Sequence, residues 1–182
     1  MTVDEHDHLS ELLVIGGRSG SGKTSTAAEI HHQLQQLGMM HAWIEGDNLD
    51  QAYPAPWRNG HDLAEQNLMA MWGNYRKLGY RRLVYTNTVS VTNYPSLTDA
   101  MGDQPRVTAI LLVASDASVA GRLGGREIGS ALDLHLERSR LRDRELDSTV
   151  GPEVHRVVTD GRTVTEIAAQ IITLTGWTDR SR

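Results

Sequence analysis

A glycine-rich run near the amino terminus constrains this chain more than any other segment. Residues Gly17 to Thr24 read Gly-Arg-Ser-Gly-Ser-Gly-Lys-Thr and match the motif G-x-x-x-x-G-K-[ST]. The apolar run Leu12–Ile15 precedes the motif, and Lys23–Leu37 follows it with apolar residues at helical spacing. A buried strand, a glycine loop and a helix in this order are the arrangement in which the motif binds phosphate. We therefore predict an α/β fold with a phosphate-binding loop at its first strand-to-helix turn.

The residue types in this loop fit the binding of a nucleoside triphosphate. Glycines let backbone N–H groups turn toward an anion, and the helix adds the positive end of its dipole. Lys23 supplies a positive charge for the terminal phosphates, and the hydroxyl of Thr24 supplies an oxygen ligand for Mg²⁺. We expect ATP and Mg²⁺ as cofactors, bound by Gly17, Ser19, Gly20, Ser21, Gly22, Lys23, Thr24 and Ser25. The alternative is a glycine-rich turn that binds nothing.

Composition bounds the class of protein. The chain has 182 residues, a net charge of −5 and no cysteine, so we expect one domain with its own core and no disulfides. No apolar run is long enough for a membrane span, and residues 1–8 are too polar for a signal peptide. The acidic balance disfavours nucleic acids and membranes as partners. We expect a cytoplasmic protein with a single domain over residues 1–182 and a flexible segment over residues 1–9. The composition is compatible with either a monomer or a homodimer.

Apolar strands alternate with helical stretches, which is typical of a parallel sheet with helices on both faces. The predicted strands are Leu12–Ile15, His41–Glu45, Arg82–Thr86, Val107–Val113 and Val154–Thr159. The predicted helices are Lys23–Leu37, Asp62–Leu78, Tyr94–Met101, Ala117–Leu123, Ala131–Leu146 and Val164–Leu174. Asp62 with Glu65, and Thr163 with Glu166, have the spacing of a side-chain cap at a helix start. The sequence thus predicts a three-layer α/β fold.

Acidic residues follow the second predicted strand, in the run Ile-Glu-Gly-Asp-Asn-Leu-Asp that begins at residue 44. Ligands of open α/β sheets bind beyond the carboxyl ends of the strands, so we expect Asp47 beside the phosphate loop. A carboxylate there accepts the proton of an attacking hydroxyl or helps to hold Mg²⁺ through water. Asp50 is a further candidate for contact with substrate. The alternative for Asp47 is a turn acid that caps the next segment.

The third predicted strand ends in Thr86, Asn87 and Thr88. Many phosphate-loop proteins have an aspartate at this place, where it helps to hold Mg²⁺. Its absence shifts metal binding toward Thr24, Asp47 and water, and it argues against a motor-type ATPase. Asn87 and Thr88 are candidates for hydrogen bonds to substrate, or else they form the turn.

Irregular segments of the chain are candidate functional loops. Residues 50–80 contain Tyr-Pro-Ala-Pro-Trp at positions 53–57, and we expect a substrate-binding insert in which Trp57 stacks on a substrate ring or packs the loop. After the last strand, Asp160 and Arg162 lie in a turn that suits contact with the nucleotide base, although an ordinary strand-to-helix turn explains them too.

Residues 121–146 predict a lid. Arg122 and Arg126 lie among glycines, and arginines on a closing loop stabilise the charge of a transferring phosphoryl group. The alternative is a solvated basic end of a helix. Arg138, on the charged helix that follows, is a candidate for contact with substrate, although a solvated face is the simpler interpretation.

These motifs, taken in order, resemble those of the small P-loop kinases. The phosphate loop, "IEGDN", "RLGGRE" and "VTDGRTVTEIAAQI" are similar to segments of the adenylylsulfate kinase, gluconate kinase, shikimate kinase, chloramphenicol phosphotransferase and zeta-toxin groups. The run "HLERSRLRDRELD" is similar to actinobacterial ATP-binding proteins near the chloramphenicol phosphotransferases and tunicamycin-resistance proteins. The resemblance implies a five-stranded parallel sheet of order 2-3-1-4-5, ATP over the phosphate loop, an arginine lid and an acid at Asp47 that faces the acceptor.

The function that follows is an ATP-dependent phosphotransferase acting on a hydroxyl of a small molecule. In this prediction Asp47, Lys23, Arg122 and Arg126 are the catalytic residues. The partner is a small-molecule acceptor such as an antibiotic, a nucleoside or nucleotide, or a sugar-like compound. The insert at 50–78 matches no member of the family, so the acceptor is not inherited from the resemblance. Two alternatives remain: a regulatory NTPase that acts through a partner, and a kinase of nucleic-acid ends.

Overall fold

Five parallel strands form one sheet in the order β2-β3-β1-β4-β5. The computed structural model describes residues 9–124 and 130–180. The strands are β1 (Glu11–Gly16), β2 (Ala42–Glu45), β3 (Arg82–Thr86), β4 (Arg106–Val113) and β5 (His155–Val158). Each predicted strand is confirmed to within one residue at each end, and the predicted strand order is confirmed as well. Of the segment 1–9 that was expected to be flexible, residues 1–8 lie outside the described residues.

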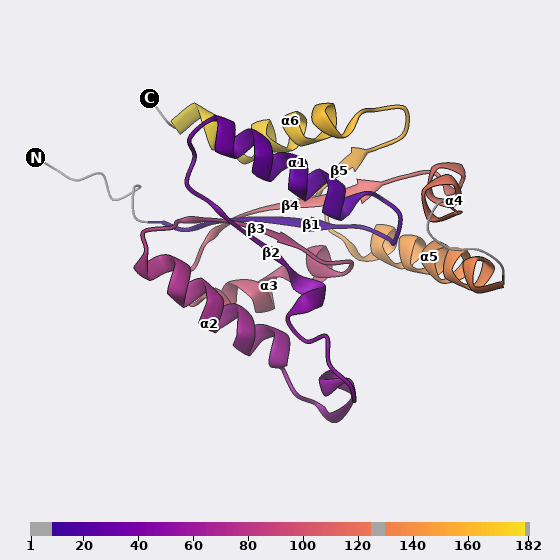
Figure 1. Cartoon of the computed structure of the whole chain (residues 1–182), viewed down its shortest axis with the longest axis horizontal. Coiled ribbons are helices and arrows are strands. Elements are labelled where there is room, and N and C mark those ends of the chain that lie inside the picture. Colours follow the sequence, from indigo (N-terminus) through magenta and orange to yellow (C-terminus); the bar gives the residue numbers. More distant parts are fainter. Residues whose placement is uncertain (1–8, 125–129, 181–182) are drawn as a thin grey trace, which may run out of the picture.

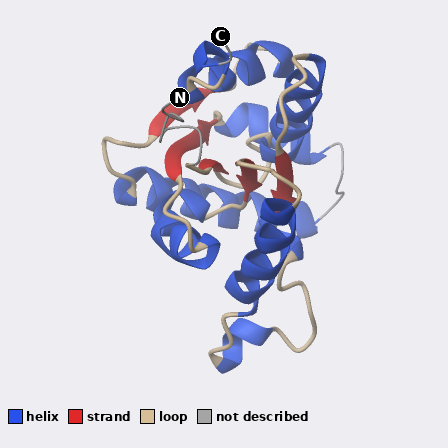
Figure 2. Cartoon of the chain, turned by 90° about the vertical axis from the view of Figure 1, so that its left-hand side faces the viewer, coloured by secondary structure: helices blue, strands red, loops and turns tan. Residues whose placement is uncertain are grey.

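Helices cover both faces of the sheet (Figure 1). The α-helices are α1 (Lys23–Gln36), α2 (Leu63–Lys77), α3 (Ser90–Met101), α4 (Asp116–Gly124), α5 (Ser130–Thr149) and α6 (Val164–Thr175), and the 3₁₀ turns are η2 (Gly46–Asn48), η3 (Pro56–Asn59) and η4 (Thr178–Arg180). Helices α1 and α6 pack on one face and α2 and α3 on the other, while α4 and α5 lie beyond the carboxyl ends of the strands (Figure 1). The segment between β2 and α2, which contains η3, projects from the body of the molecule (Figure 2).

Strand β1 explains why the first apolar run lacks polar alternation. Leu12 and Val14 belong to the core under α2 and α3, whereas Leu13 and Ile15 belong to the core under α1 and α6. All four side chains are at most 1% exposed. A central parallel strand is buried on both faces, so each residue must be apolar whichever way it points.

Helix α3 differs from its predicted start. It begins at Ser90, whereas the sequence predicted Tyr94, and its backbone leaves the helical region at Asn93 (φ −121°, ψ 17°). Pro95 lies within it. Proline lacks an N–H and clashes with the preceding turn, so the first turn and the rest of the helix meet at a kink.

One of the two predicted side-chain caps is correct. At the start of α6, Thr163 and Glu166 form a reciprocal capping box. At the start of α2, Asp62 makes no capping hydrogen bond, because its backbone (φ −86°, ψ 54°) is outside the extended region that N-cap residues adopt. The prediction for Asp62 and Glu65 is therefore wrong.

None of the helices in the described ranges is long and apolar enough to cross a membrane.

The packing of α6 on α1 yields a test of the core. Ile171 is 0% exposed within the cluster shared by the two helices and the sheet. We expect Ile171→Ala to lower the free energy of unfolding by about 2–5 kcal/mol, because the truncation leaves a cavity in a packed interior. Urea titration measures the change. The exposed Thr173→Ala on the same helix is the control, and an equal loss in both variants would contradict this packing.

Candidate active site

The glycine-rich loop connects β1 to α1 and has the backbone that its motif requires. Gly17, Gly20 and Gly22 have φ values of 141°, 80° and 101°, which side-chain-bearing residues rarely adopt. A Cβ at Gly17 would lie 2.8 Å from the carbonyl oxygen of Leu112 and 2.8 Å from the hydroxyl of Ser21. Both conformation and space therefore demand glycine here.

Lys23 curls back over this loop. Its Nζ donates to the carbonyl of Gly17 at 2.8 Å and to that of Arg18 at 3.2 Å. Burial lowers the pKa of the Lys23 ammonium, while the carboxylates of Asp47 and Glu45 oppose this shift. The loop thus holds a desolvated positive charge at the start of α1, where the helix dipole adds to its attraction for anions.

A cavity of about 480 Å³ opens over the loop and α1. The predicted site residues that line it are Ser19, Gly20, Ser21, Gly22, Lys23, Thr24, Ser25, Asp47, Thr88, Arg122 and Arg162. Sequence reasoning missed Thr26, Leu123, Thr159, Val164 and Ile167, which complete the lining. We call this space the donor cavity. Its volume is in the range of ordinary small-ligand sites.

Asp47 is positioned by an amide from the neighbouring strand. The side-chain nitrogen of Asn87 donates to Oδ1 of Asp47 at 2.6 Å, and the oxygen of Asn87 accepts from the backbone N–H of Val89 at 2.9 Å. The second bond orients the amide so that its donor faces the carboxylate. Strand register explains the meeting: Glu45 and Ile15 both pair with Thr86, so the residues that follow emerge at the same edge.

A second cavity of about 330 Å³ adjoins this pair. It lies between the η2–η3 segment, α2, β3 and α3, and its lining is Asp50, Trp57, His61, Asp62, Ala64, Glu65, Tyr85, Asn87, Val89, Ser90, Asn93 and Leu97. We call it the insert cavity. Asn87 lines the insert cavity and holds Asp47, which lines the donor cavity. The Asp47–Asn87 pair therefore lies between the two cavities.

Arg122 lies in the last turn of α4 against the phosphate loop. One terminal nitrogen is 3.2 Å from the carbonyl oxygens of Gly20 and Ser21 and from the hydroxyl of Thr159. Its charge is thus attached to the wall of the donor cavity. Arg126, the other predicted lid residue, lies outside the described residues.

Three other predicted residues have different placements. Asp160 accepts hydrogen bonds from the backbone N–H of Ser115 at 2.8 Å and from its hydroxyl at 3.1 Å; contacts with Ser118 and Ser115 hold the pKa of Asp160 below its usual value. Arg162 lies in the turn before α6, where it lines the donor cavity and its guanidinium is 2.6 Å from the side-chain oxygen of Gln170. Arg138 is exposed on α5 and lines neither cavity.

The strand-end aspartate is absent, as the sequence indicated, because Thr86 and Asn87 occupy that place. Within residues 9–124 and 130–180 no group of three histidines or acids is arranged to hold a metal ion by itself. Thr24 and Asp47 both line the donor cavity and remain the predicted oxygen ligands for Mg²⁺.

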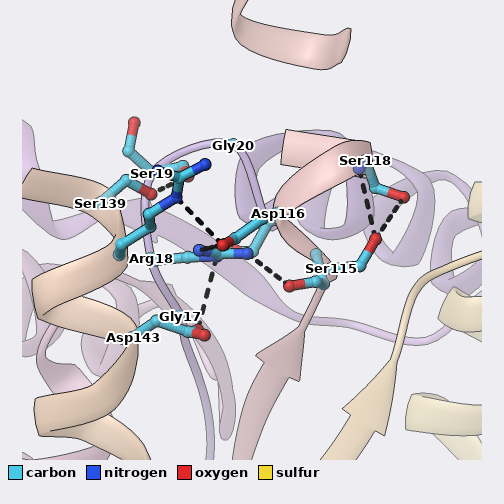
Figure 3. A network of polar contacts seen from close by, with 12 residues as sticks. Gly17, Arg18, Ser19, Gly20, Ser115, Asp116, Ser118, Ser139 and Asp143 are labelled. Carbon is cyan, nitrogen blue, oxygen red and sulfur yellow. Dashed lines mark hydrogen bonds and ion pairs between the residues drawn. The ribbon is translucent and has the colours of Figure 1, made fainter. Parts of the chain in front are cut away.

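Arg18, a variable position of the motif, is an anchor that the sequence did not reveal. Its side chain is 1% exposed and reaches from the loop to α4 and α5 (Figure 3). The guanidinium donates to Asp116 Oδ1 and to the carbonyl of Ala114, both at 2.6 Å, and its Nε lies 3.5 Å from Asp143. Burial raises the pKa of the Asp143 carboxyl although Arg18 opposes the rise.

Helix α5 also contacts the loop directly. The buried hydroxyl of Ser139 donates to the carbonyl of Ser19 at 3.0 Å (Figure 3). The loop is therefore attached to α5 on one side and to α4 through Arg18 and Arg122. Ser139 and Asp143 lie four residues apart and therefore on one face of α5. The sequence contains this spacing, but the many charged residues around it make the pair hard to recognise as a contact surface.

Loss of the Arg18 contacts should reduce both the stability of the fold and the binding of nucleotide. We expect Arg18→Ala to lower the free energy of unfolding by about 1.5–3 kcal/mol, because hydrogen bonds to charged groups are lost and Asp143 keeps no buried counter-charge. We also expect weaker ATP binding, measured by calorimetry. Arg140→Ala is the control, since Arg140 pairs with the same Asp116 at 3.0 Å but is half-exposed. A loss no larger than the control's would exclude the anchor.

Comparison with known proteins places the fold. No family model matches the sequence, and no curated protein matches it. Among solved structures, the tunicamycin resistance protein of Deinococcus radiodurans is 21% identical with a TM-score of 0.64, and the match covers 92% of this chain and 96% of that one. The APS kinase of Mycobacterium tuberculosis, solved with AMPPNP and APS, is 20% identical with a TM-score of 0.57 and coverages of 91% and 97%.

A gluconokinase from Sinorhizobium meliloti is 19% identical with a TM-score of 0.56, and the match covers 92% of this chain and 93% of that one. With the strand order β2-β3-β1-β4-β5 and the glycine loop after β1, the chain has the fold of the small P-loop kinases.

Proposed function

We propose that this protein transfers the terminal phosphoryl group of Mg·ATP to a hydroxyl of a small molecule. The observation that carries the proposal is the junction between the two cavities. The donor cavity contains the phosphate loop, and a hydrogen-bonded acid and amide connect it to the insert cavity. A phosphotransferase needs a donor site and an acceptor site side by side, because the two substrates must meet in line.

The loop fits a triphosphate on its own geometry. Its three left-handed glycines form the backbone of an anion cradle, and the buried Ser21 hydroxyl has no hydrogen-bond partner in the described chain. Lys23 now donates to two loop carbonyls and would exchange them for phosphate oxygens. Thr24 and Asp47 would hold Mg²⁺, Asp47 through water. When bound, Mg²⁺ neutralises phosphate charge and orients the phosphates.

Asp47 is the acid that would face the acceptor. Asn87 occupies part of Oδ1, which leaves the remaining lone pairs of the carboxylate for the acceptor hydroxyl. As the acceptor oxygen bonds to the γ-phosphorus, its proton passes to Asp47 and the bond from that phosphorus to the ADP oxygen breaks. Lys23 and Arg122 would stabilise the negative charge on the transferring group from fixed positions. Arg126 keeps its predicted place in this set.

The structural neighbours support the proposal at the level of reaction class. An APS kinase and a gluconokinase share the architecture, and the former was solved with the nucleotide AMPPNP. For this chain the cofactors would be ATP and Mg²⁺, and the partner a small-molecule acceptor.

The proposal is tested by incubating the protein and ATP with a library of hydroxylated metabolites and antibiotics. Mass spectrometry identifies the product, which is heavier by one phosphoryl group. ATP consumption should depend on the accepted compound, whereas a regulatory NTPase would consume ATP at the same rate without one.

The proposed role of Lys23 in the phosphate loop can be tested by its effect on the transfer rate. Lys23→Ala should lower the transfer rate at least about a hundredfold, because the fixed charge on the transferring group is lost. The urea midpoint should stay near the wild-type value, since the Nζ hydrogen bonds are not in the core. Turnover at the wild-type rate would remove Lys23 from the site.

The proposed role of Asp47 as the base can be tested by a variant that changes the transfer rate but not ATP affinity. Asp47→Asn should slow transfer about 10²- to 10⁴-fold, since an amide does not accept the hydroxyl proton. ATP affinity, measured by calorimetry, should change little, because the loop and Lys23 carry most of the contacts with phosphate. A rate near wild type would show that Asp47 is not the base.

A further inference from the structure

The insert cavity has an unusual charge for a space beside a phosphate site. Asp50, Asp62 and Glu65 line it, and the described lining includes His61 but no lysine or arginine. The neighbouring donor cavity would hold a polyanion. A cavity with this lining repels an anionic acceptor and attracts a cationic one.

These carboxylates have no other task in the described chain. Asp62 does not cap α2, although it is the N-cap residue. No described basic residue forms an ion pair with Asp50, Asp62 or Glu65. Asp50 and Glu65 are partly buried, so their charges are screened less than those of surface acids. Their counter-charge is expected to arrive with a ligand.

Tyr85 supplies an independent sign of a ligand. The side chain is 4% exposed, lines the insert cavity, and makes no hydrogen bond with any described residue. Its hydroxyl oxygen is not itself fully enclosed, so an occupant of the cavity can hydrogen-bond to it. Gly46 makes room for it: a Cβ at Gly46 would lie 2.3 Å from the Tyr85 hydroxyl.

The electrostatics of this tyrosine agree with a negative cavity. Burial raises the pKa of Tyr85 well above its ordinary value, and the carboxylates of Glu65, Asp47 and Asp50 raise it further. The phenol stays protonated and can donate to the oxygen of an acceptor.

Trp57 adds a surface that prefers cations. Its side chain is 56% exposed and lines the cavity from η3. An indole face attracts ammonium groups as well as ring carbons. The cavity volume of about 330 Å³ suits a ligand of one or two rings.

We propose that the acceptor is an amine-bearing polyol, such as an amino sugar, aminocyclitol or amino nucleoside, whose ammonium group binds among Asp50, Asp62 and Glu65. One of its hydroxyls then reaches Asp47 at the junction of the cavities. This inference rests on the phosphotransferase function and names its substrate class. It also excludes sugar acids, because their carboxylate would lie among three like charges.

The test compares acceptors that differ in one charge. Wild-type protein and Mg·ATP are assayed with a panel of amine-bearing polyols, the N-acetylated form of each, and sugar acids such as gluconate. N-acetylation removes the charge and keeps the hydroxyls. We expect kcat/KM to fall about ten- to a hundredfold on N-acetylation, the scale of one charge-assisted hydrogen bond, and no product from the acids.

Isosteric variants identify the carboxylates. Asp62→Asn with Glu65→Gln should lower kcat/KM for the amine about tenfold or more and leave the N-acetylated compound nearly unchanged. The matched control is Asp179→Asn, the same chemical change on η4 at the far end of α6. Urea titration verifies that each variant is folded.

A binding arm separates this inference from the proposed function. Glucosamine, 2-deoxystreptamine, N-acetylglucosamine and gluconate are titrated without ATP, and the NMR signals of the Trp57 indole and the Asn87 side-chain amide are followed. Saturable shifts with the two amines alone support the inference. If no compound of any charge is phosphorylated, the phosphotransferase proposal fails and this titration still decides the cavity's preference. Equal binding of the N-acetylated sugar, binding of gluconate, or preferred phosphorylation of neutral or acidic acceptors would overturn it.

Discussion

Parallel pairing of β1 with β3 on one side and β4 on the other is the constraint on which the site depends. It brings the carboxyl ends of β2, β3, β1 and β4 to one edge. The phosphate loop follows β1, the acid follows β2 and the amide follows β3, so three separate turns become neighbours. Because β1 is buried on both faces, the strand has little freedom to move, and the start of the loop that follows it is held in place as well.

The loop is also held from outside the sheet. It is connected to α4 by the buried guanidinium of Arg18 and by one guanidinium nitrogen of Arg122. It is connected to α5 by the hydroxyl of Ser139. Rigid attachment suits the proposed phosphoryl transfer, which would depend mainly on positioning and fixed charge. The same contacts link the positions of α4 and α5 directly to the glycine loop.

Several local predictions held because each depends on neighbours in the sequence. The strands, the glycine loop and the Thr163–Glu166 cap follow from short-range patterns of apolarity, conformation and hydrogen bonding. The cap predicted for Asp62 is wrong, because residue spacing alone does not reveal the backbone dihedral angles of the residue before the helix. Helix α3 begins earlier than predicted, because the apolar pattern does not show the kinked first turn that precedes Tyr94.

The sequence by itself determined the architecture and the glycine loop between β1 and α1, because a strand, a glycine-rich turn and a helix are specified by consecutive residues. It also indicated Asp47 through the general rule for strand ends. Only the tertiary structure showed the anchor at Arg18, the amide that orients Asp47, and the acidic cavity formed by Asp50, Asp62, Glu65 and Tyr85. Those residues come from the η2–η3 segment, α2 and β3, and no sequence period relates them. Their common charge becomes meaningful only when folding places them around one space without a counter-charge among the described residues.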